Sequence, residues 1–167
     1  VKGSVVNAAT NIYGRMPGQF VPGHPIAGSE RSGVTAADSK LFEHHKVILT
    51  PTETTESKHL EAVASLWIGV GAKVASMPVE EHDEILAATS HLPHFLAYSL
   101  VGTLASMEDK REIFRYAAGG FRDFTRIAAS DPVMWRDIAL ANRASILSTL
   151  DHVMDNFTAL RGAIDSG

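Results

Sequence analysis

Residues 20–33 read FVPGHPIAGSERSG and set His24 between a glycine and Pro25. We predict a short buried strand that ends at Val21, just before this turn-forming sequence. Pro25 fixes its own φ and biases His24 away from helix, so we expect His24 to lie on a rigid turn that no regular ladder crosses. α/β enzymes present catalytic side chains on such loops after a strand. The tripeptide alone is equally compatible with a surface loop that carries an idle histidine.

On both sides of this stretch the sequence alternates between helical and strand patterns. Apolar residues at helical spacing predict a helix over 1–14, closed by a glycine. The short apolar runs KVILT at 46–50 and AKVASM at 72–77 are typical of strands. Between them, cap-forming residues at 52–57 open a helix that Gly69 ends. The strand–helix–strand order predicts the remainder of an α/β layer.

The pattern changes at Pro78, which opens a long helical segment that Pro93 is expected to kink or divide. Two short helices within 113–129 are predicted to break at Gly119–Gly120. Asp131, which is followed by a proline, is a strong helix start, and the pattern stays helical from there to the end of the sequence. We therefore divide the chain into an α/β part, 1–77, and a helical part, 78–167.

The last helical segment carries a seam of apolar residues whose spacings alternate between four and three. Its members are Ile146, Leu150, Val153, Phe157, Leu160 and Ile164. A heptad-like seam of this kind packs against another helix, either in its own chain or in a partner.

Charge and composition exclude several classes of protein. The net charge of −4 is made of interspersed signs, so the sequence lacks the basic patch of a nucleic-acid-binding protein. The absence of cysteine excludes disulfides and thiolate metal sites. No apolar run reaches the length needed to span a bilayer, so no membrane association is expected.

Three motifs carry a resemblance to a known family. HPIAGSE followed by SG in residues 24–33, HDEILAATSHLPH at 82–94 and FRDFTRIAASDPVMW at 121–135 resemble motifs of the prephenate/arogenate dehydrogenases of tyrosine biosynthesis. The three motifs occur in the family's order and span most of the chain. The resemblance implies a mostly α fold with a partial α/β layer: the C-terminal part of a Rossmann-type nucleotide-binding domain, followed by an all-α dimerisation domain.

The resemblance also implies an activity and partners. Enzymes of this family carry out the oxidative decarboxylation of prephenate to 4-hydroxyphenylpyruvate, or act on arogenate, with NAD or NADP as the hydride acceptor. It further implies a cytoplasmic protein that forms a homodimer through its C-terminal helices. The rival interpretation is a non-catalytic helical dimerisation module with only vestigial site residues.

The dinucleotide fingerprint G-x-G-x-x-G does not occur in the sequence. The G-x-G at Gly69–Gly71 follows a predicted helix and is better interpreted as a helix stop. Family members carry the fingerprint in an N-terminal half, so we expect this chain to be a fragment of a longer protein and inactive alone. Its residues that would bind the cofactor are therefore unknown.

Family resemblance gives His24 the role of catalytic base. An imidazole has an ordinary pKa near 6.5, so it can be neutral and accept a proton at working pH. Arg126 matches the arginine that holds a substrate carboxylate, although Arg122 lies one helical turn away and spacing alone cannot choose between the two. Glu30 matches a residue that gates the pocket by pairing with that arginine; the alternative is an exposed charge.

Further family positions fall on the helical part of the chain. His94 matches a contact to the substrate side chain, and Trp135 and Asp123 match positions near the pocket, where packing or helix capping would explain them equally well. His82 has no assigned role. We expect no metal site, because a straight helix would separate His82 from His94 by about 18 Å.

Overall fold

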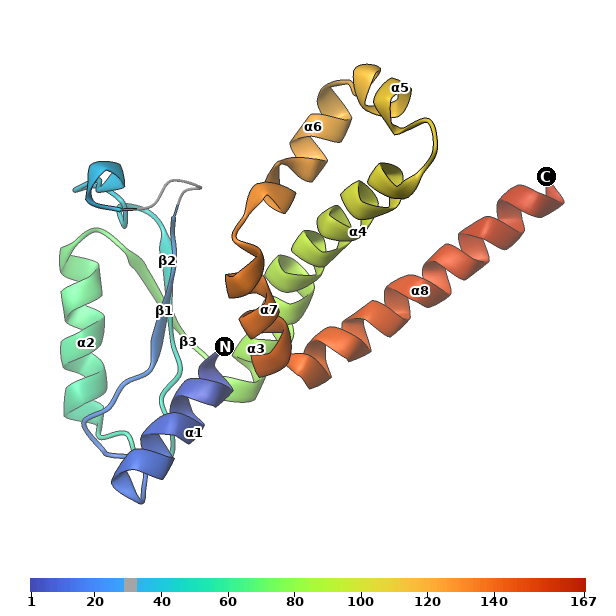
Figure 1. Cartoon of the computed structure of the whole chain (residues 1–167). Helices are drawn as coiled ribbons and strands as arrows, with labels where there is room; N and C mark the ends of the chain where they lie inside the picture. The colour runs from blue at the N-terminus through green and yellow to red at the C-terminus, as the bar shows by residue number, and fades with distance from the viewer. Residues whose placement is uncertain (29–32) are drawn as a thin grey trace. The chain divides into compact units, whose positions relative to one another are not determined.

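The computed structural model describes residues 1–28 and 33–167, and the chain folds as two compact units, Val1–Asp83 and Glu84–Gly167 (Figure 1). The expected fold class is confirmed, since the chain is mostly helical and carries one small three-stranded sheet. Each unit has its own packing and is described by itself.

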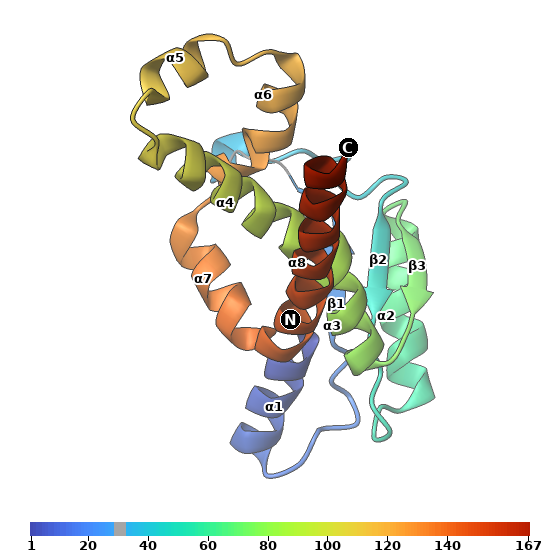
Figure 2. The ribbon, with the colours of Figure 1, turned by 90° about the vertical axis from the view of Figure 1, so that its right-hand side faces the viewer.

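The first unit contains a sheet with one helix packed on it. Its elements are α1 (Lys2–Tyr13), β1 (Gly23–Ile26), the 3-10 turn η1 (Val34–Ala36), β2 (Lys46–Leu49), α2 (Ser57–Gly69) and β3 (Lys73–Ser76). The strand order is β1-β2-β3, with β1 antiparallel to β2 and β2 parallel to β3. The predicted strand–helix–strand unit is therefore present as β2–α2–β3, and Figure 2 shows β2 and β3 side by side.

The core of this unit forms around β2, the central strand. Val47 and Leu49 are fully buried and cluster with Ala72. Alternate side chains of a strand point to opposite faces, so the burial of Ile48 as well shows that both faces of β2 are covered. The apolar face predicted for α2 packs against this cluster through Leu60, Val63, Ala64 and Trp67.

The turn predicted at His24 is wrong, because β1 runs through that residue. His24 pairs with Ile48 and Pro25 pairs with Val47 in an antiparallel register. The N–H of Thr50 donates to the carbonyl of Pro22 at 2.8 Å, which makes that pair a hydrogen-bonded one. Alternation along the ladder then places Pro25 at a non-hydrogen-bonded position, so its missing N–H faces away from β2. A proline is tolerated at such a position of an edge strand.

We interpret the sequence Gly69–Gly71 as a helix stop, and α2 does end at Gly69, with Gly71 in the turn that follows. The φ of Gly71, 86°, lies in the left-handed region, which glycine adopts without steric cost. A Cβ at this position would also come within 3.1 Å of the Glu43 side chain.

The second unit is built from helices. Their bounds are α3 (Val79–Leu86, which begins in the first unit), the π-helical turn η2 (Ala87–His91), α4 (Leu92–Ser106), α5 (Lys110–Arg115), α6 (Gly119–Thr125), the 3-10 turn η3 (Arg126–Ala129), α7 (Pro132–Ala141) and α8 (Arg143–Ser166). The α6–η3 segment returns alongside α4, as Figure 1 shows. The start predicted for α7 is confirmed, because Asp131 accepts hydrogen bonds from the N–H groups of Val133 and Met134 at 2.7 and 3.2 Å.

The interruption predicted at Pro93 takes the form of the π-helical turn η2. Helix continues from Val79 to Ser106, but five residues directly before α4 adopt the wider π geometry. Pro93 lies in the first turn of α4 and has no N–H to donate to the preceding turn. A π turn is one of the ways in which a helix accommodates such a missing hydrogen bond.

Two predicted boundaries in this half differ from the structure. Gly119 and Gly120 do not break a helix but open α6, where the first N–H groups have no intrahelical acceptor and weak helix formers cost little. The last helical stretch is divided at Asn142, whose φ of −114° separates α7 from α8. Asn142 is buried, and its side chain contacts His91 instead of solvent.

The seam on α8 is buried at its start and exposed toward its end. Ile146 is 7% exposed, whereas Phe157, Leu160 and Ile164 are 57%, 55% and 74% exposed. Among the described residues, no helix is long and apolar enough to cross a membrane.

We predict that Leu49→Ala lowers the free energy of unfolding by about 2–5 kcal/mol, because it leaves a cavity in the centre of the first unit's core. Urea denaturation of the 167-residue chain measures this. Leu66→Ala is the matched control: Leu66 is 63% exposed on α2, so its loss should change stability by no more than about 0.5 kcal/mol. Equal effects of the two variants would contradict the assignment of the core.

Candidate active site

His24 lies against a second histidine that the sequence left without a role. Nδ1 of His24 is 2.9 Å from Nε2 of His82, and the ring centroids are 5.1 Å apart with the planes tilted by 59°. His24 is half-buried on β1, whereas His82, on α3, is only 1% exposed. The structure therefore orients the predicted catalytic histidine through a buried imidazole.

Asp83 fixes the other side of the His82 ring. Its Oδ1 is 2.8 Å from Nδ1 of His82, and the carboxylate also accepts hydrogen bonds from the backbone N–H groups of Lys2 and Gly3 at 2.7 and 2.8 Å. Those two N–H groups belong to the first turn of α1, where helices have no internal acceptors and where a negative charge is favourable. The carboxylate thus caps α1 and holds His82 at the same time.

Burial and hydrogen bonding set the charges of this pair. Burial lowers the pKa of His82 from its ordinary 6.5, and the hydrogen bond and charge of Asp83 only partly oppose this. Burial would raise the pKa of Asp83, but the hydrogen bonds from Lys2, Gly3 and His82 together bring it below 3.8. At neutral pH the pair is a neutral imidazole beside a carboxylate.

A crevice of about 500 Å³ lies at the carboxyl ends of the two parallel strands. It is lined by Gly3, Val6, Asn7, Pro51, Thr52, Glu53, Pro78, Val79 and Glu80. The first turns of α1, the segment after β2 and the segment after β3 therefore meet there. In open α/β sheets, ligands bind outside the carboxyl ends of the strands.

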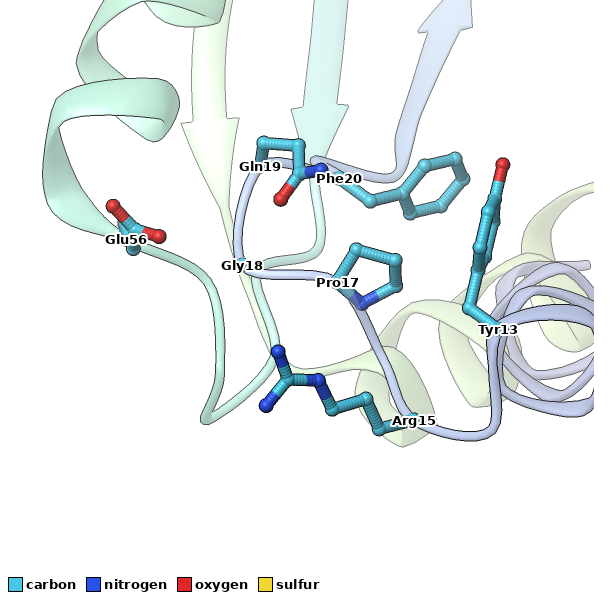
Figure 3. A pocket seen from close by; sticks show the side chains of 7 residues that line it. All are labelled: Tyr13, Arg15, Pro17, Gly18, Gln19, Phe20 and Glu56. Carbon is cyan, nitrogen blue, oxygen red and sulfur yellow. The ribbon is translucent and has the colours of Figure 1, made fainter.

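A second hollow, of about 400 Å³, lies between the end of α1 and the loop that follows it (Figure 3). Its described lining consists of Tyr13, Arg15, Pro17, Gly18, Gln19, Phe20 and Glu56. None of these is a predicted site residue, so we do not place the site there.

In the second unit, His94 stacks on Trp135. Their ring centroids are 3.7 Å apart and the planes differ by 21°. The Nδ1–H of His94 donates to the carbonyl of Ser90 at 2.8 Å, because a carbonyl can only accept. The ring of His94 is therefore held both in orientation and in tautomer, with Nε2 as its acceptor nitrogen.

Trp135 is the centre of an aromatic cluster that extends beyond the predicted pair. Phe95 and His91 meet its ring edge-on at 5.9 and 6.1 Å. Its indole Nε1 is buried without a hydrogen-bond partner among the described residues. His91, in turn, contacts the Asn142 side chain at 3.3 Å, and the sequence pattern had singled out neither of these two as a site residue.

The arginine candidates both lie on the segment that packs against α4. Arg122 belongs to α6 and Arg126 opens η3, and the N–H of Arg126 bonds the carbonyl of Arg122, so the two are one turn apart. Both side chains are exposed, as is that of Asp123.

The described residues thus bring two predicted site residues together, His94 and Trp135, and set the predicted catalytic residue His24 against His82, which had no assigned role. Glu30 lies outside the described residues. Within the described ranges there is no group of three or more acidic or histidine side chains that could hold a metal ion.

Comparison with known proteins gives the two units a family. Residues 1–76 match the model of the prephenate dehydrogenase nucleotide-binding domain, and residues 78–167 match that of the prephenate dehydrogenase dimerization domain. Both models describe parts of one class of protein, a dehydrogenase with a nucleotide-binding and a dimerization domain. The chain belongs to the prephenate dehydrogenase family.

Individual relatives agree with this assignment. The chain is 43% identical to the cyclohexadienyl dehydrogenase of Zymomonas mobilis over 98% of its own length and 57% of the relative's. It is 44% identical to the prephenate dehydrogenase of Bacillus subtilis over 88% of its length and 40% of the relative's. The chain therefore spans only about half the length of the curated relatives it matches.

Solved structures show the same relationship. The prephenate dehydrogenase of Aquifex aeolicus in complex with hydroxyphenyl propionate and NAD+ matches with a TM-score of 0.87 and 44% identity, over 97% of this chain and 56% of that one. The arogenate dehydrogenase of Synechocystis matches with a TM-score of 0.83 and 26% identity, over 98% of this chain and 58% of that one.

We predict that Asp83→Asn lowers the free energy of unfolding by about 1–3 kcal/mol at pH 7, because an amide cannot replace a carboxylate that accepts three hydrogen bonds. Urea denaturation measures the change, and Asp123→Asn, at an exposed position, is the matched control.

The pH dependence of the same measurement follows from the two lowered pKa values. The contribution of ionised Asp83 is complete above pH 3.8 and is lost as the pH falls through its lower folded pKa. Neutral His82 contributes fully above pH 6.5, and its contribution declines as the pH falls below that value toward its folded pKa. Stability that does not fall on acidification below pH 6.5 would contradict the buried neutral state of His82.

Proposed function

We propose that this chain is part of an NAD(P)-dependent prephenate or arogenate dehydrogenase of tyrosine biosynthesis, an oxidoreductase of the cytoplasm. Residues 1–77 are the remainder of its nucleotide-binding domain and residues 78–167 its helical substrate and dimerisation domain. The observation that carries the proposal is the match, over 97% of this chain, to a prephenate dehydrogenase solved with hydroxyphenyl propionate and NAD+. The reaction is the oxidative decarboxylation of prephenate to 4-hydroxyphenylpyruvate, or its counterpart on arogenate.

His24 is the proposed base that accepts the proton of the substrate hydroxyl. The contact of its Nδ1 with His82 supports this role, because it holds the ring in a fixed orientation. Proton transfer to a positioned side chain typically contributes about 10²–10⁴ in rate. The buried His82–Asp83 pair holds one ring nitrogen of His24, which favours this role over the rival interpretation, a module with vestigial site residues.

The remaining roles concern substrate binding. Arg126 is the proposed partner of a substrate carboxylate, for which a guanidinium offers two parallel N–H donors. His94 is the proposed contact to the pyruvyl end, and its stacking on Trp135 supports a fixed orientation. Glu30, proposed to pair with Arg126, and Asp123, proposed to lie near the pocket, rest on the sequence resemblance alone.

The cofactor proposed is NAD or NADP, whose nicotinamide supplies the hydride acceptor when bound. The crevice at the carboxyl ends of β2 and β3 fits the nicotinamide end of such a molecule. Asn7 and Thr52 line it and offer the amide and hydroxyl groups that a carboxamide can bond. The pyrophosphate loop is not in this sequence, so the 167-residue chain alone is proposed to be inactive.

The proposed assembly is a homodimer through the helices of residues 78–167. The match to a dimerization-domain model supports it, as does the exposure of Phe157, Leu160 and Ile164 on α8. Apolar surface that is removed from water stabilises an interface by about 25 cal/mol per Å². A second copy of the chain is the simplest partner for this face, because two-fold dimers are the commonest closed assemblies.

The reaction is tested in a longer protein, in which this chain is joined to an N-terminal half that contains the phosphate loop. We expect His24→Asn to lower kcat by about 10²–10⁴ with little change in KM, because asparagine keeps a hydrogen bond but cannot take a proton. Arg126→Ala should mainly raise KM, because it removes a contact made already in the ground state. Steady-state kinetics with prephenate and with arogenate measure both.

Arg122→Ala is the control for the arginine, one turn away on the same segment. A rise in KM for Arg122→Ala but not for Arg126→Ala would assign the carboxylate to the other arginine, and an unchanged kcat for His24→Asn would remove His24 from the mechanism.

For the assembly, we expect Phe157→Glu and Leu160→Glu together to convert a dimer into a monomer, because each puts a charge into the apolar seam at an exposed position that the fold of one chain does not need. Light scattering measures the mass at micromolar concentration. Arg161→Glu changes the charge of the same helix without removing apolar surface and should leave the dimer intact. A monomeric unmutated chain would contradict the proposal.

A further inference from the structure

His82 is held in a defined protonation state from one side. Its Nδ1 faces Oδ1 of Asp83 at 2.8 Å, and that carboxylate also accepts two backbone N–H groups of α1. An ionised carboxylate can only accept, so Nδ1 of His82 carries a hydrogen. In a neutral imidazole the second nitrogen then carries the lone pair, so Nε2 of His82 is an acceptor.

That acceptor determines the tautomer of His24. Nε2 of His82 lies 2.9 Å from Nδ1 of His24, and the contact requires one donor and one acceptor. Because Nε2 of His82 accepts, Nδ1 of His24 donates, and Nε2 of His24 carries the lone pair. Only one assignment of hydrogens therefore satisfies both contacts while both imidazoles are neutral.

Protonation of His82 would reverse the arrangement. Nε2 of His82 would then donate to Nδ1 of His24. The hydrogen of neutral His24 would lie on its own Nε2, and that nitrogen could not take a proton from the substrate. Burial and the charge of Lys2 oppose the charged form of His82, whereas Asp83 favours it, and the balance keeps the pKa of His82 below 6.5. Among the residues that the structure describes, the ring of His24 also faces His82.

We propose that His82 is a positioning residue, which accepts the Nδ1–H of His24 and thereby holds His24 in the tautomer whose Nε2 can take a proton. The proposal rests on the proposed function in one respect, the role of His24 as base. His82 touches His24 and Asp83, and it acts on the substrate only through His24.

The His82–Asp83 pair also brings a negative charge, the carboxylate of Asp83, close to the proposed base His24. When Nε2 of His24 takes the proton of the substrate hydroxyl, the O–H electron pair stays on the oxygen, and His24 becomes an imidazolium that still donates from Nδ1 to His82. The carboxylate of Asp83 lies on the far side of the His82 ring, where it favours positive charge on the two imidazoles. His24 and His82 together thus form one supported unit.

Nuclear magnetic resonance of the 167-residue chain, with ¹⁵N-labelled histidine at pH 8, tests the tautomers directly. Long-range ¹H–¹⁵N correlation distinguishes a protonated ring nitrogen from one with a lone pair. We expect Nδ1 protonated and Nε2 unprotonated in both His24 and His82. A hydrogen on Nε2 of His24, or a mixture of its two tautomers, would overturn the proposal.

Two variants of His82 distinguish its role as a hydrogen-bond acceptor from its role in packing. In His82→Gln the amide oxygen can still accept from Nδ1 of His24, so the tautomer should be kept. In His82→Leu there is no acceptor, and His24 should shift to a mixture of tautomers. His94, held by the carbonyl of Ser90 in the second unit, is the internal control and should not change in either variant. An unchanged His24 tautomer in His82→Leu would refute the role, and if neither variant folds, the unmutated chain still decides.

Kinetics of the longer protein give the second readout. We expect His82→Leu to lower kcat at least tenfold and to change the pH profile of kcat, with KM nearly unchanged, and His82→Gln to restore most of the rate. A wild-type kcat and pH profile in His82→Leu would overturn the proposal. Failure of the unmutated protein to act on prephenate or arogenate would instead refute the proposed function, and the tautomer measurement would still decide the role of His82.

Discussion

The carboxylate of Asp83 is the interaction on which the first unit most depends. It joins residues about 80 positions apart, because it binds the first turn of α1 and the imidazole of its own neighbour on α3. A buried carboxylate is costly unless it is hydrogen-bonded, and here the two backbone N–H groups and one ring N–H repay that cost. The same side chain therefore closes the unit from its first helix to its last and determines how His82 meets His24.

In the second unit, aromatic rings instead of a charged group join segments that are far apart in the chain. His91, His94 and Phe95 come from one helical segment and all contact Trp135, which α7 brings to them. Spacings of three and four residues place side chains on one face of a helix, so one indole can meet all three. The helix start at Asp131 matters for this cluster because it fixes where α7 begins and hence where Trp135 lies. Local capping and long-range packing are coupled at this point.

Sequence patterns predicted the elements whose causes are local. Strands β2 and β3, helix α2 and the cap at Asp131 follow from apolar runs, glycine stops and a capping side chain, all within a few residues. The path of β1 through His24 could not be predicted in this way, because a proline is tolerated only in a register that β2 supplies from 22 residues away.

The support behind His24 was missed for a related reason. The dipeptide His82–Asp83 opens a motif that the sequence resemblance had already marked, so a signal was present, but its partners lie 58 to 81 residues earlier in the chain. No spacing rule connects such positions. Residue types alone gave His82 no role, whereas the contacts place His82 with His24 and His94 with Trp135.

The π-helical turn at Ala87–His91 makes the length of this segment more important than its composition. Each residue of a helix turns the chain by about 100°, so the removal of one residue here would rotate every later side chain of α4 by about that angle relative to Leu86. His94 would then leave the face on which it meets Trp135. Substitutions at the exposed Ala88 and Thr89 can be absorbed one at a time, but an insertion or deletion within Ala87–His91 cannot, and the segment is in effect a spacer of fixed length.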